Sequence, residues 1–431
     1  MTAEPLGRLP LRARALYASS SLGGEAVSQS RGLWLLFLYT DELGLDTALV
    51  GGLLFAGRLL EAFDDPLVAH WSDRTRSRWG RRIPFVVAAT PFWGLFAVLL
   101  FSPPAETGAA ATAAYLFVVL ELMFLFSTLA GGPYEALLPE IARTSADRVS
   151  IVSLRVYFGA AGGAVGVVAS GAIIDVIGFR GMALVMAVLL VVTRYAGVSG
   201  AWRHASRTQP PATLPFRSAV AATFANPSFR VFLPTFVLFQ TALLMLLGVL
   251  PFQAEAVLGE ERADRWVSIM TGTALAAAVA LVPLFARLAR RTSKRQAYAA
   301  AMLAAALGFP LLGLAGFLPA IPVEVQLVVL LAVAGAPLVG VYLFPAALTA
   351  DIVDDDARRT GMRREAMYFG TQNFVEKTTT ALAPLLLGLL LTLGRTAEDP
   401  LGIRLVGPAA GLLVLAGWVV FRGYRLPDEV R

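Results

Sequence analysis

Residues 203–230 read RHASRTQPPATLPFRSAVAATFANPSFR and form the longest polar stretch of the chain. Pro210, Pro211 and Pro215 lie inside it, and mostly apolar sequence extends from it in both directions. The 431 residues are 57% hydrophobic and 15% charged, whereas soluble globular chains are about 45–50% apolar and about 25% charged. Because too few polar residues remain to cover a water-facing exterior, the sequence predicts an all-α membrane protein.

The apolar sequence on either side of residues 203–230 divides into stretches long enough to cross a bilayer, for which a helix needs about 20 largely apolar residues. About twelve transmembrane helices are predicted, at 15–40, 47–71, 84–103, 108–138, 150–175, 180–200, 230–254, 264–289, 297–318, 322–350, 366–393 and 402–423. Six helices before a long central loop and six after it are the layout of the major facilitator fold. We therefore expect an N-terminal bundle over 1–202, a cytoplasmic loop over 203–229 and a C-terminal bundle over 230–431.

Basic residues follow the even-numbered spans. Arginines crowd the link at 72–83, and further basic groups lie at 290–295 and 358–364, whereas the links at 41–47 and 102–108 contain none. Since cytoplasmic loops are enriched in Lys and Arg, we expect both termini in the cytoplasm. Lysine occurs only at positions 294 and 377, which is typical of a GC-rich bacterial genome, so we expect the protein in the inner membrane of a bacterium.

Missing residue types argue against several classes of protein. The chain has no cysteine and only two histidines, His70 and His204, which excludes thiolate chemistry and a histidine metal cluster. It has no Gly-x-Ser-x-Gly nucleophile motif and no recognisable signalling domain, so an enzyme and a non-transporting scaffold or sensor are disfavoured. Its net charge of +6 lies in the links, as membrane topology requires, and does not indicate nucleic-acid binding. No cofactor beyond a coupling ion is expected, and we expect a monomer.

Four ionisable residues lie in the second predicted span: Arg58, Glu61, Asp64 and Asp65. Such residues are costly in hydrocarbon, by estimates from about 2.5 kcal/mol upward, and usually face a cavity, a partner or a pathway. Glu61 and Asp65 are four residues apart and share one helix face, with Asp64 at its edge. Arg58 can balance one carboxylate, so the others must bind a proton or a metal cation. The alternative is a structural ion-pair network near the cytoplasmic end of the helix.

Polar residues occur in other spans as well. Glu121, Thr128 and Glu135 follow one another at intervals of seven in the fourth span and lie roughly on one face, although Glu135 also fits the cytoplasmic boundary. Arg155 in the fifth span is close enough to the helix end for its side chain to reach water. The remaining ones are Glu25 in the first span and Glu376 and Lys377 in the eleventh.

Two pairs of glycines are spaced by four in the fifth span: Gly159 with Gly163, and Gly162 with Gly166. Small residues at this spacing let two membrane helices approach closely. We expect them to pack the fifth span against a neighbouring helix.

Two long motifs resemble the signatures of one transporter family. The first contains Gly57-Arg58, Glu61, Asp64-Asp65-Pro66, Ser72-Asp73-Arg74 and Arg81-Arg82-Ile83-Pro84; the second contains Ala350-Asp351, Asp354, Thr360-Gly361, Arg363-Arg364-Glu365, Tyr368 and Lys377. Both are similar to the glycoside–pentoside–hexuronide:cation symporters of the major facilitator superfamily, which are melibiose permease-like. The resemblance implies a symporter of a sugar, glycoside or uronide, driven by H⁺ or Na⁺ and working by alternating access.

The resemblance also implies a role for each matching residue. It places Glu61, Asp65 and Thr128 at the coupling cation, with Asp64 where sodium-coupled sugar members often have asparagine; if the ion is Na⁺, Glu61 and Asp65 are its ligands. The expected substrate-site residues are Glu25, Glu135, Arg155, Tyr368, Gln372 and Lys377. Gly131 and Glu135 stand where melibiose permease has a sugar-binding aspartate and a stacking tryptophan, which argues against a galactoside.

The sequence leaves two alternatives for the coupling ion and two for the arginines of the cytoplasmic gate. An added carboxylate at Asp64 favours protonation of the group, yet it also offers Na⁺ another oxygen ligand; the balance favours H⁺ slightly. Ion pairs of Asp73 with Arg78 and Arg81, and of Asp351 with Arg363 or Arg364, are expected to break as the gate opens, although these arginines also fit a purely topological role. A lysolipid carrier of the same fold is the main rival function.

Overall fold

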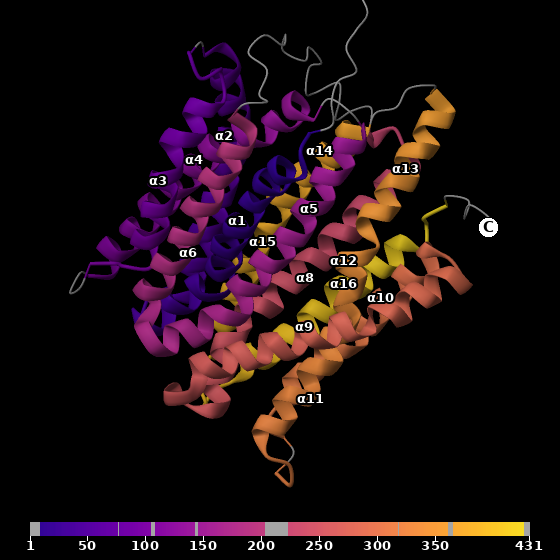
Figure 1. Ribbon diagram of the computed structural model, residues 1–431. Helices are drawn as coiled ribbons and strands as arrows, with labels where there is room; N and C mark the ends of the chain where they lie inside the picture. Colours follow the sequence, from indigo (N-terminus) through magenta and orange to yellow (C-terminus); the bar gives the residue numbers. More distant parts are fainter. Residues whose placement is uncertain are drawn as a thin grey trace, which may run out of the picture. The chain divides into compact units, whose positions relative to one another are not determined.

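The computed structural model describes residues 9–75, 77–104, 108–142, 145–202, 223–317, 319–360 and 365–425. All of the regular secondary structure in these ranges is helical (Figure 1). The chain separates into two compact units, one formed by residues 1–45 and 56–212 and the other by residues 46–55 and 213–431. The first turns of α2 therefore group with the second unit, and each unit is described by itself below.

Unit 1 is built from six helices, two of which end or begin in π-helical turns. They are α1 (Leu11–Phe37) with η1 (Leu38–Glu42), α2 (Thr47–Arg74), α3 (Ile83–Leu100), α4 (Ala109–Ile141), α5 (Ser145–Ala164) with η2 (Val165–Ala169), and α6 (Ser170–Trp202). Gly178 inside α6 has φ 71° and ψ 175°, which are not helical angles and suit a residue without a Cβ. The chain bends there, so α5, η2 and α6 make two successive passes.

Unit 2 contains the remaining helices. They are α8 (Pro227–Leu258), α9 (Glu260–Arg291), α10 (Lys294–Gly308) with η3 (Phe309–Leu314), α11 (Val323–Gly335), η4 (Ala336–Leu338), α12 (Val339–Leu343), α13 (Pro345–Thr360), α14 (Glu365–Thr380), α15 (Leu382–Leu391) and α16 (Leu401–Phe421). Elements α11 to α13 follow one another almost without interruption, as do α14 and α15.

Joining these consecutive elements gives twelve helical passes within the described ranges. Eight helices there are long and apolar enough to cross a membrane, and one of them, at 150–202, contains two passes. Three passes are not among these eight: α1, α2 and the α11–α13 run, whose apolar helix at 323–338 is shorter than the length required. Helices α1 and α2 carry charged residues within their length, and these are the helices where charged groups inside the protein are expected.

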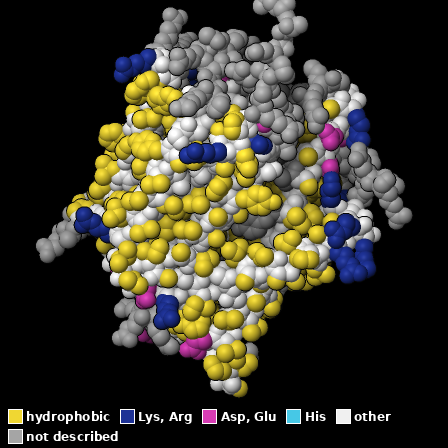
Figure 2. Space-filling model, in the orientation of Figure 1, with side chains coloured by type: hydrophobic (Ala, Val, Ile, Leu, Met, Phe, Trp, Pro, Cys, Tyr) yellow, Lys and Arg dark blue, Asp and Glu magenta, His cyan; other side chains and the backbone are white. Residues whose placement is uncertain are grey.

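Apolar side chains cover much of the visible face, and Lys and Arg lie near its margins and at a few places in its upper middle part (Figure 2). Val176 is 78% exposed, Leu307 67% and Leu412 66%. Large apolar side chains exposed in this number are costly in water but stable in contact with lipid tails. The surface therefore agrees with a multi-pass membrane protein.

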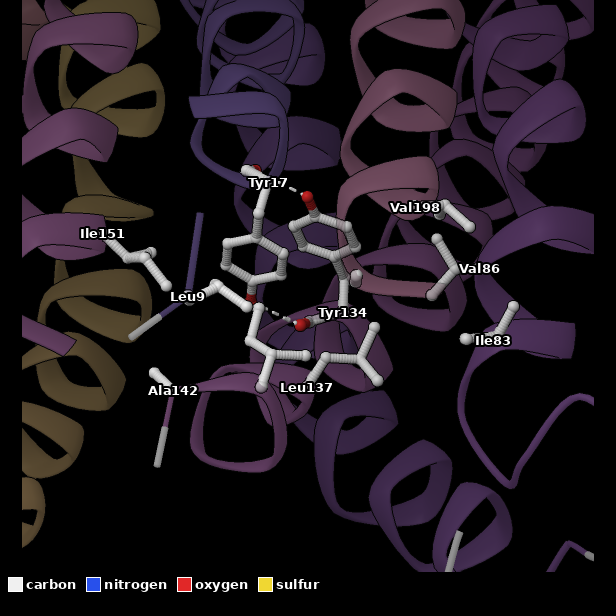
Figure 3. Close-up of a cluster of buried hydrophobic side chains, with 11 residues drawn as sticks. Leu9, Tyr17, Ile83, Val86, Tyr134, Leu137, Ala142, Ile151 and Val198 are labelled. Carbon is white, nitrogen blue, oxygen red and sulfur yellow. Dashed lines mark hydrogen bonds between the residues drawn. The ribbon is translucent and has the colours of Figure 1, made fainter. Parts of the chain in front are cut away.

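The core of unit 1 is organised around a pair of stacked tyrosines (Figure 3). The rings of Tyr17 in α1 and Tyr134 in α4 lie 4.6 Å apart between centroids and are nearly parallel. Each hydroxyl donates a hydrogen bond to the other residue's backbone carbonyl, at 2.8 Å from Tyr17 and 2.6 Å from Tyr134. Apolar side chains such as Leu137 and Ile151 close the cluster. Its tyrosine pair joins α1 to α4.

The glycine pairs of α5 and η2 lie against α1, in agreement with the predicted contact to a neighbouring helix. A Cβ at Gly162 would collide with the backbone of Leu22, and one at Gly166 would lie 2.5 Å from the carbonyl oxygen of Ala26. Gly159 and Gly163 instead face the side chains of Glu25 and Gln29 at ordinary contact distances. One glycine pair thus sets the helix contact, and the other leaves room beside polar residues of α1.

Candidate functional site

The carboxylates predicted in the second span lie within α2. Glu61 is 6% exposed, and its Oε2 accepts a hydrogen bond from Nη1 of Arg58 at 2.7 Å, one helical turn away. Asp64 is partly buried, while the side chain of Asp65 lies outside the described part of the structure. Arg58 thus balances one carboxylate.

A polar face of α4 lies against this part of α2. Gly57 lets the two helices approach: a Cβ there would come within 2.7 Å of Oε1 of Glu121 and 2.9 Å of Leu120. Glu121 also lies within electrostatic range of Glu61 and Asp64. We call Glu61, Asp64 and Glu121 the carboxylate cluster.

Two buried oxygens on α4 lack a hydrogen-bond partner among the described residues. They are Oε1 of Glu121 and Oγ1 of Thr128, and Thr128 is only 4% exposed. A buried polar atom without a partner is costly, so both oxygens are suited to a ligand that the protein itself does not supply. No group of three or more Asp, Glu, His or Cys residues in the described ranges has metal-binding geometry.

An arginine of α1 also reaches this region. The Arg31 guanidinium carbon lies 4.7 Å from the ring centre of Phe124, and that of Arg58 lies 5.2 Å from the same centre. Arg31 is within electrostatic range of both Arg58 and Glu61. The carboxylate cluster therefore has two guanidinium groups beside it, where the sequence predicted one.

A second polar group of unit 1 joins α1, α4 and α5. Both nitrogens of the Arg155 guanidinium fork donate to the carboxylate of Glu135, and Nε of Arg155 donates to Ser21 at 3.3 Å. Glu25 lies beside Gly159, one helical turn before Gln29 in α1, and is within electrostatic range of Arg155. Three predicted substrate residues, Glu25, Glu135 and Arg155, are therefore brought together.

The other predicted substrate residues lie in unit 2. Gln372 is 6% exposed and accepts a hydrogen bond from Thr349 at 2.7 Å, while Tyr368 is packed edge-on against Phe229. Lys377 is exposed on α14. Its neighbour Glu376, for which the sequence offered no explanation, accepts a hydrogen bond from Gln240 of α8 at 2.8 Å.

The basic links form ion pairs that the sequence did not predict. Arg81 and Arg82 contact Glu140 at the end of α4 at 3.1 and 2.9 Å, and Asp351 pairs with Lys294 at 2.7 Å. Arg78 is exposed and lies over the Trp79 ring. The side chain of Asp73 and the whole of Arg363 lie outside the described residues, so the pairs predicted for them stay predictions.

Three charged residues of unit 1 were missed by sequence reasoning: Arg31, Glu140 and Arg194. Arg194 of α6 is 6% exposed and lies over the rings of Tyr134 and Trp93, at 4.5 and 5.2 Å from their centres. A charged residue inside a predicted span was the available signal for Arg31 and Arg194. Glu140 is close enough to a helix end to pass for a boundary residue.

The sequence profile of the MFS/sugar transport protein family matches residues 16–400. The chain belongs to this family, which confirms the resemblance drawn from its two motifs. The family consists of transporters, so the expectation of a non-enzymatic, multi-pass membrane protein is also confirmed.

Individual relatives agree with this assignment. The inner membrane symporter YicJ of Escherichia coli is 31% identical over 46% of this chain and 44% of YicJ. The putative sulfoquinovose importer of Salmonella typhimurium is 26% identical over 98% of this chain and 91% of that protein. Several matches are partial: the chain spans 29%, 44% and 35% of the length of three curated relatives.

Among solved structures, a crystal structure of the nucleoside transporter NupG matches with a TM-score of 0.69. The two sequences are 13% identical, and the match covers 95% of this chain and 99% of that one. At such low identity the likeness concerns the fold alone. The predicted major facilitator fold is confirmed.

Proposed function

We propose that this protein is a cation-coupled symporter that carries a sugar, glycoside or uronide across the bacterial inner membrane by alternating access. The observation that carries the proposal is the carboxylate cluster on α2 and α4, inside a chain of the sugar transporter family. Charged groups held within membrane-spanning helices are costly and are retained where a pathway uses them. Both termini are placed in the cytoplasm, as the basic links favour.

The coupling cation belongs at the carboxylate cluster in this proposal. Glu61 has Arg58 as a partner at 2.7 Å, and Asp64, Glu121 and Asp65 add further carboxylates on the same two helices. A cation bound beside them, together with the hydroxyl of Thr128, neutralises the group and lowers the cost of enclosing it away from water. Neutralisation lets the two halves close over the solute, which makes ion and solute movement depend on each other.

The solute belongs beside Glu25, Glu135 and Arg155. Carboxylates accept hydrogen bonds from sugar hydroxyls, and a guanidinium donates several from a fixed fork. Arg155 is bonded to Glu135, so a solute hydroxyl or acid group that replaces Glu135 would take over hydrogen bonds already aimed in the right direction. Gln372, Lys377 and Tyr368 of unit 2 are proposed as further substrate-binding residues.

The test is uptake into proteoliposomes under imposed H⁺ or Na⁺ gradients. Glycosides, uronides and lysolipids are screened first, and every transported solute is then tested with Glu61→Gln and Asp65→Asn. Gradient-driven sugar uptake that both substitutions reduce by about tenfold or more, equivalent to about 1.4 kcal/mol, supports the proposal. Glu398→Gln, in the exposed link before α16, is the matched control and is expected to transport normally.

Other outcomes of the same screen contradict the proposal. Uptake of lysolipids but of no glycoside or uronide would show that the solute is a lysolipid. Sugar uptake that survives both substitutions would show that the coupling cation does not bind at the carboxylate cluster. Equilibration of a sugar that no gradient can drive uphill would show that the protein is a uniporter.

A further inference from the structure

Arg31 is a buried charge that the proposed mechanism does not use. It lies in α1, and the region around it is formed by α2 and α4. Its Nε is buried and has no hydrogen-bond partner among the described residues. Its guanidinium lies over the face of Phe124 and within electrostatic range of Arg58 and Glu61. A side chain placed in this way contributes charge to the region more than it contributes hydrogen bonds.

Phe124 fixes where this charge lies. An aromatic face attracts a cation, and the attraction strengthens when water is excluded. Arg31 and Arg58 approach the same ring at 4.7 and 5.2 Å, and the Glu61 carboxylate is bonded to Arg58. Phe124 follows Glu121 by three residues on α4, so ring and carboxylate lie on the same side of that helix. Arg31 is therefore held beside the cluster by a contact that needs no carboxylate of its own.

Arginine keeps its charge at neutral pH, and its planar head is more weakly hydrated than a compact cation. With Arg31 present, two fixed positive charges face the three members of the carboxylate cluster. This leaves one negative charge of the cluster unbalanced, and a sodium ion that balanced it would also be repelled by the two guanidinium groups beside it. A proton adds charge on a carboxylate oxygen itself and needs no ring of free oxygen ligands.

We propose that Arg31 is a tethered counter-cation that takes the electrostatic place of a metal ion at Glu61, so that this protein works without Na⁺. The inference rests on the proposed function, because it assigns the ion of the same site. Arg31 is a positioning and specificity-determining residue here: it selects which cation the carboxylate cluster accepts. Removing its charge should open the site to Na⁺.

The first experiment needs no solute. The full-length protein is purified in detergent, and its melting temperature is measured in NaCl, LiCl, KCl and choline chloride at equal ionic strength. The wild-type protein should melt at the same temperature in all four salts. Arg31→Gln and Arg31→Met should be stabilised by NaCl over choline chloride by about 2–5 °C, as expected for an ion that binds the folded state. Arg31→Lys keeps the charge and should behave like the wild type.

Arg194→Gln is the matched control. Arg194 is also a buried arginine of unit 1 lying over aromatic rings, but no described contact connects it to the carboxylate cluster. Its loss should lower the melting temperature equally in every salt. The same ion-independent loss in Arg31→Gln and Arg31→Met would show that Arg31 only holds helices together, which would overturn the proposal. Stabilisation of the wild-type protein by NaCl alone would overturn it too.

Uptake measurements separate this inference from the proposed function. Wild-type uptake should follow a proton gradient and ignore Na⁺, and Arg31→Gln should gain a Na⁺ requirement. If no solute is accumulated by the wild type under any gradient, the proposed function fails, while the pattern of melting temperatures still decides the role of Arg31. If wild-type uptake requires Na⁺, the protein is a symporter as proposed, but the role proposed for Arg31 is wrong.

Discussion

At the scale of single residues, Tyr134 takes part in several interactions of unit 1 at once. It stacks on Tyr17, donates a hydrogen bond to the Tyr17 carbonyl, and lies under the guanidinium of Arg194. Its hydroxyl also occupies the space that a side chain at Gly197 would need. The glycine and the tyrosine are therefore matched, and α6 can approach α4 only because position 197 has no Cβ.

Replacing Tyr134 by phenylalanine removes one hydroxyl and leaves the stacked rings in place. The carbonyl of Tyr17 then loses a buried donor, for which we expect a cost of about 0.5–1.5 kcal/mol in the free energy of unfolding. The measurement is a melting curve of the purified protein. Tyr157→Phe is the matched control, because Tyr157 is 74% exposed and its change should leave the curve where it was. Equal melting of both variants would mean that the Tyr134 hydroxyl does not stabilise the fold.

At the scale of single elements, the contact between α1 and α5 depends on one face of a glycine-rich helix. Gly162 and Gly163 are neighbours in the sequence, but only Gly162 faces the backbone of α1. Gly162→Ala should force the helices apart and cost about 1–3 kcal/mol through overpacking. Gly163→Ala places a Cβ 3.9 Å from the Gln29 side chain, so we expect little change. Melting temperatures of the two variants test this, and an equal loss would contradict the packing described.

The two basic links make ion pairs of different strength. Glu140, whose side chain is 3% exposed, pairs with arginines that are 18% and 12% exposed, whereas Asp351 and Lys294 are 38% and 49% exposed. Removing one partner of a buried pair typically costs about 3–5 kcal/mol, and exposed pairs contribute about 0–1 kcal/mol.

We therefore expect Glu140→Gln to lower the melting temperature strongly and Asp351→Asn to change it little. Adding salt should not alter the first effect and should reduce the second, because salt screens exposed charges. The comparison fails if the two substitutions cost the same. It also fails if the effect of Glu140→Gln disappears at high ionic strength.

For the whole molecule, sequence reasoning predicted the fold class better than the charge contacts. The major facilitator fold and its family could be predicted from the lengths of the apolar spans, the polar stretch at 203–230 and the two motifs. These are local properties of the sequence. The partners of Arg81, Glu135 and Glu376 depend on which helices are neighbours, and no spacing along one helix contains that information. Arg31 shows the same limit: its position in α1 was visible, but its contact with Phe124 of α4 was not.

Topology is the whole-molecule property that the basic links predict and that a chemical label can test. The chain contains no cysteine, so a single introduced thiol is the only site of labelling and no background needs to be removed. Ser77 is exposed in the arginine-rich link after α2, and Ser102 lies in the link after α3, which has no basic residue. Serine to cysteine changes little in size, so both variants should fold.

The positive-inside rule places the link at Ser77 in the cytoplasm and the link at Ser102 on the other side. In intact cells, a maleimide that cannot cross the membrane should therefore label Ser102→Cys and spare Ser77→Cys, and in inside-out vesicles the labelling should reverse. Because α3 is 18 residues long, about 27 Å at 1.5 Å per residue, the two links are separated by one crossing and cannot lie on the same side. Labelling of Ser77→Cys from outside would show that the predicted orientation of every link in unit 1 is reversed. The proposed cytoplasmic gate would then lie at the outer face.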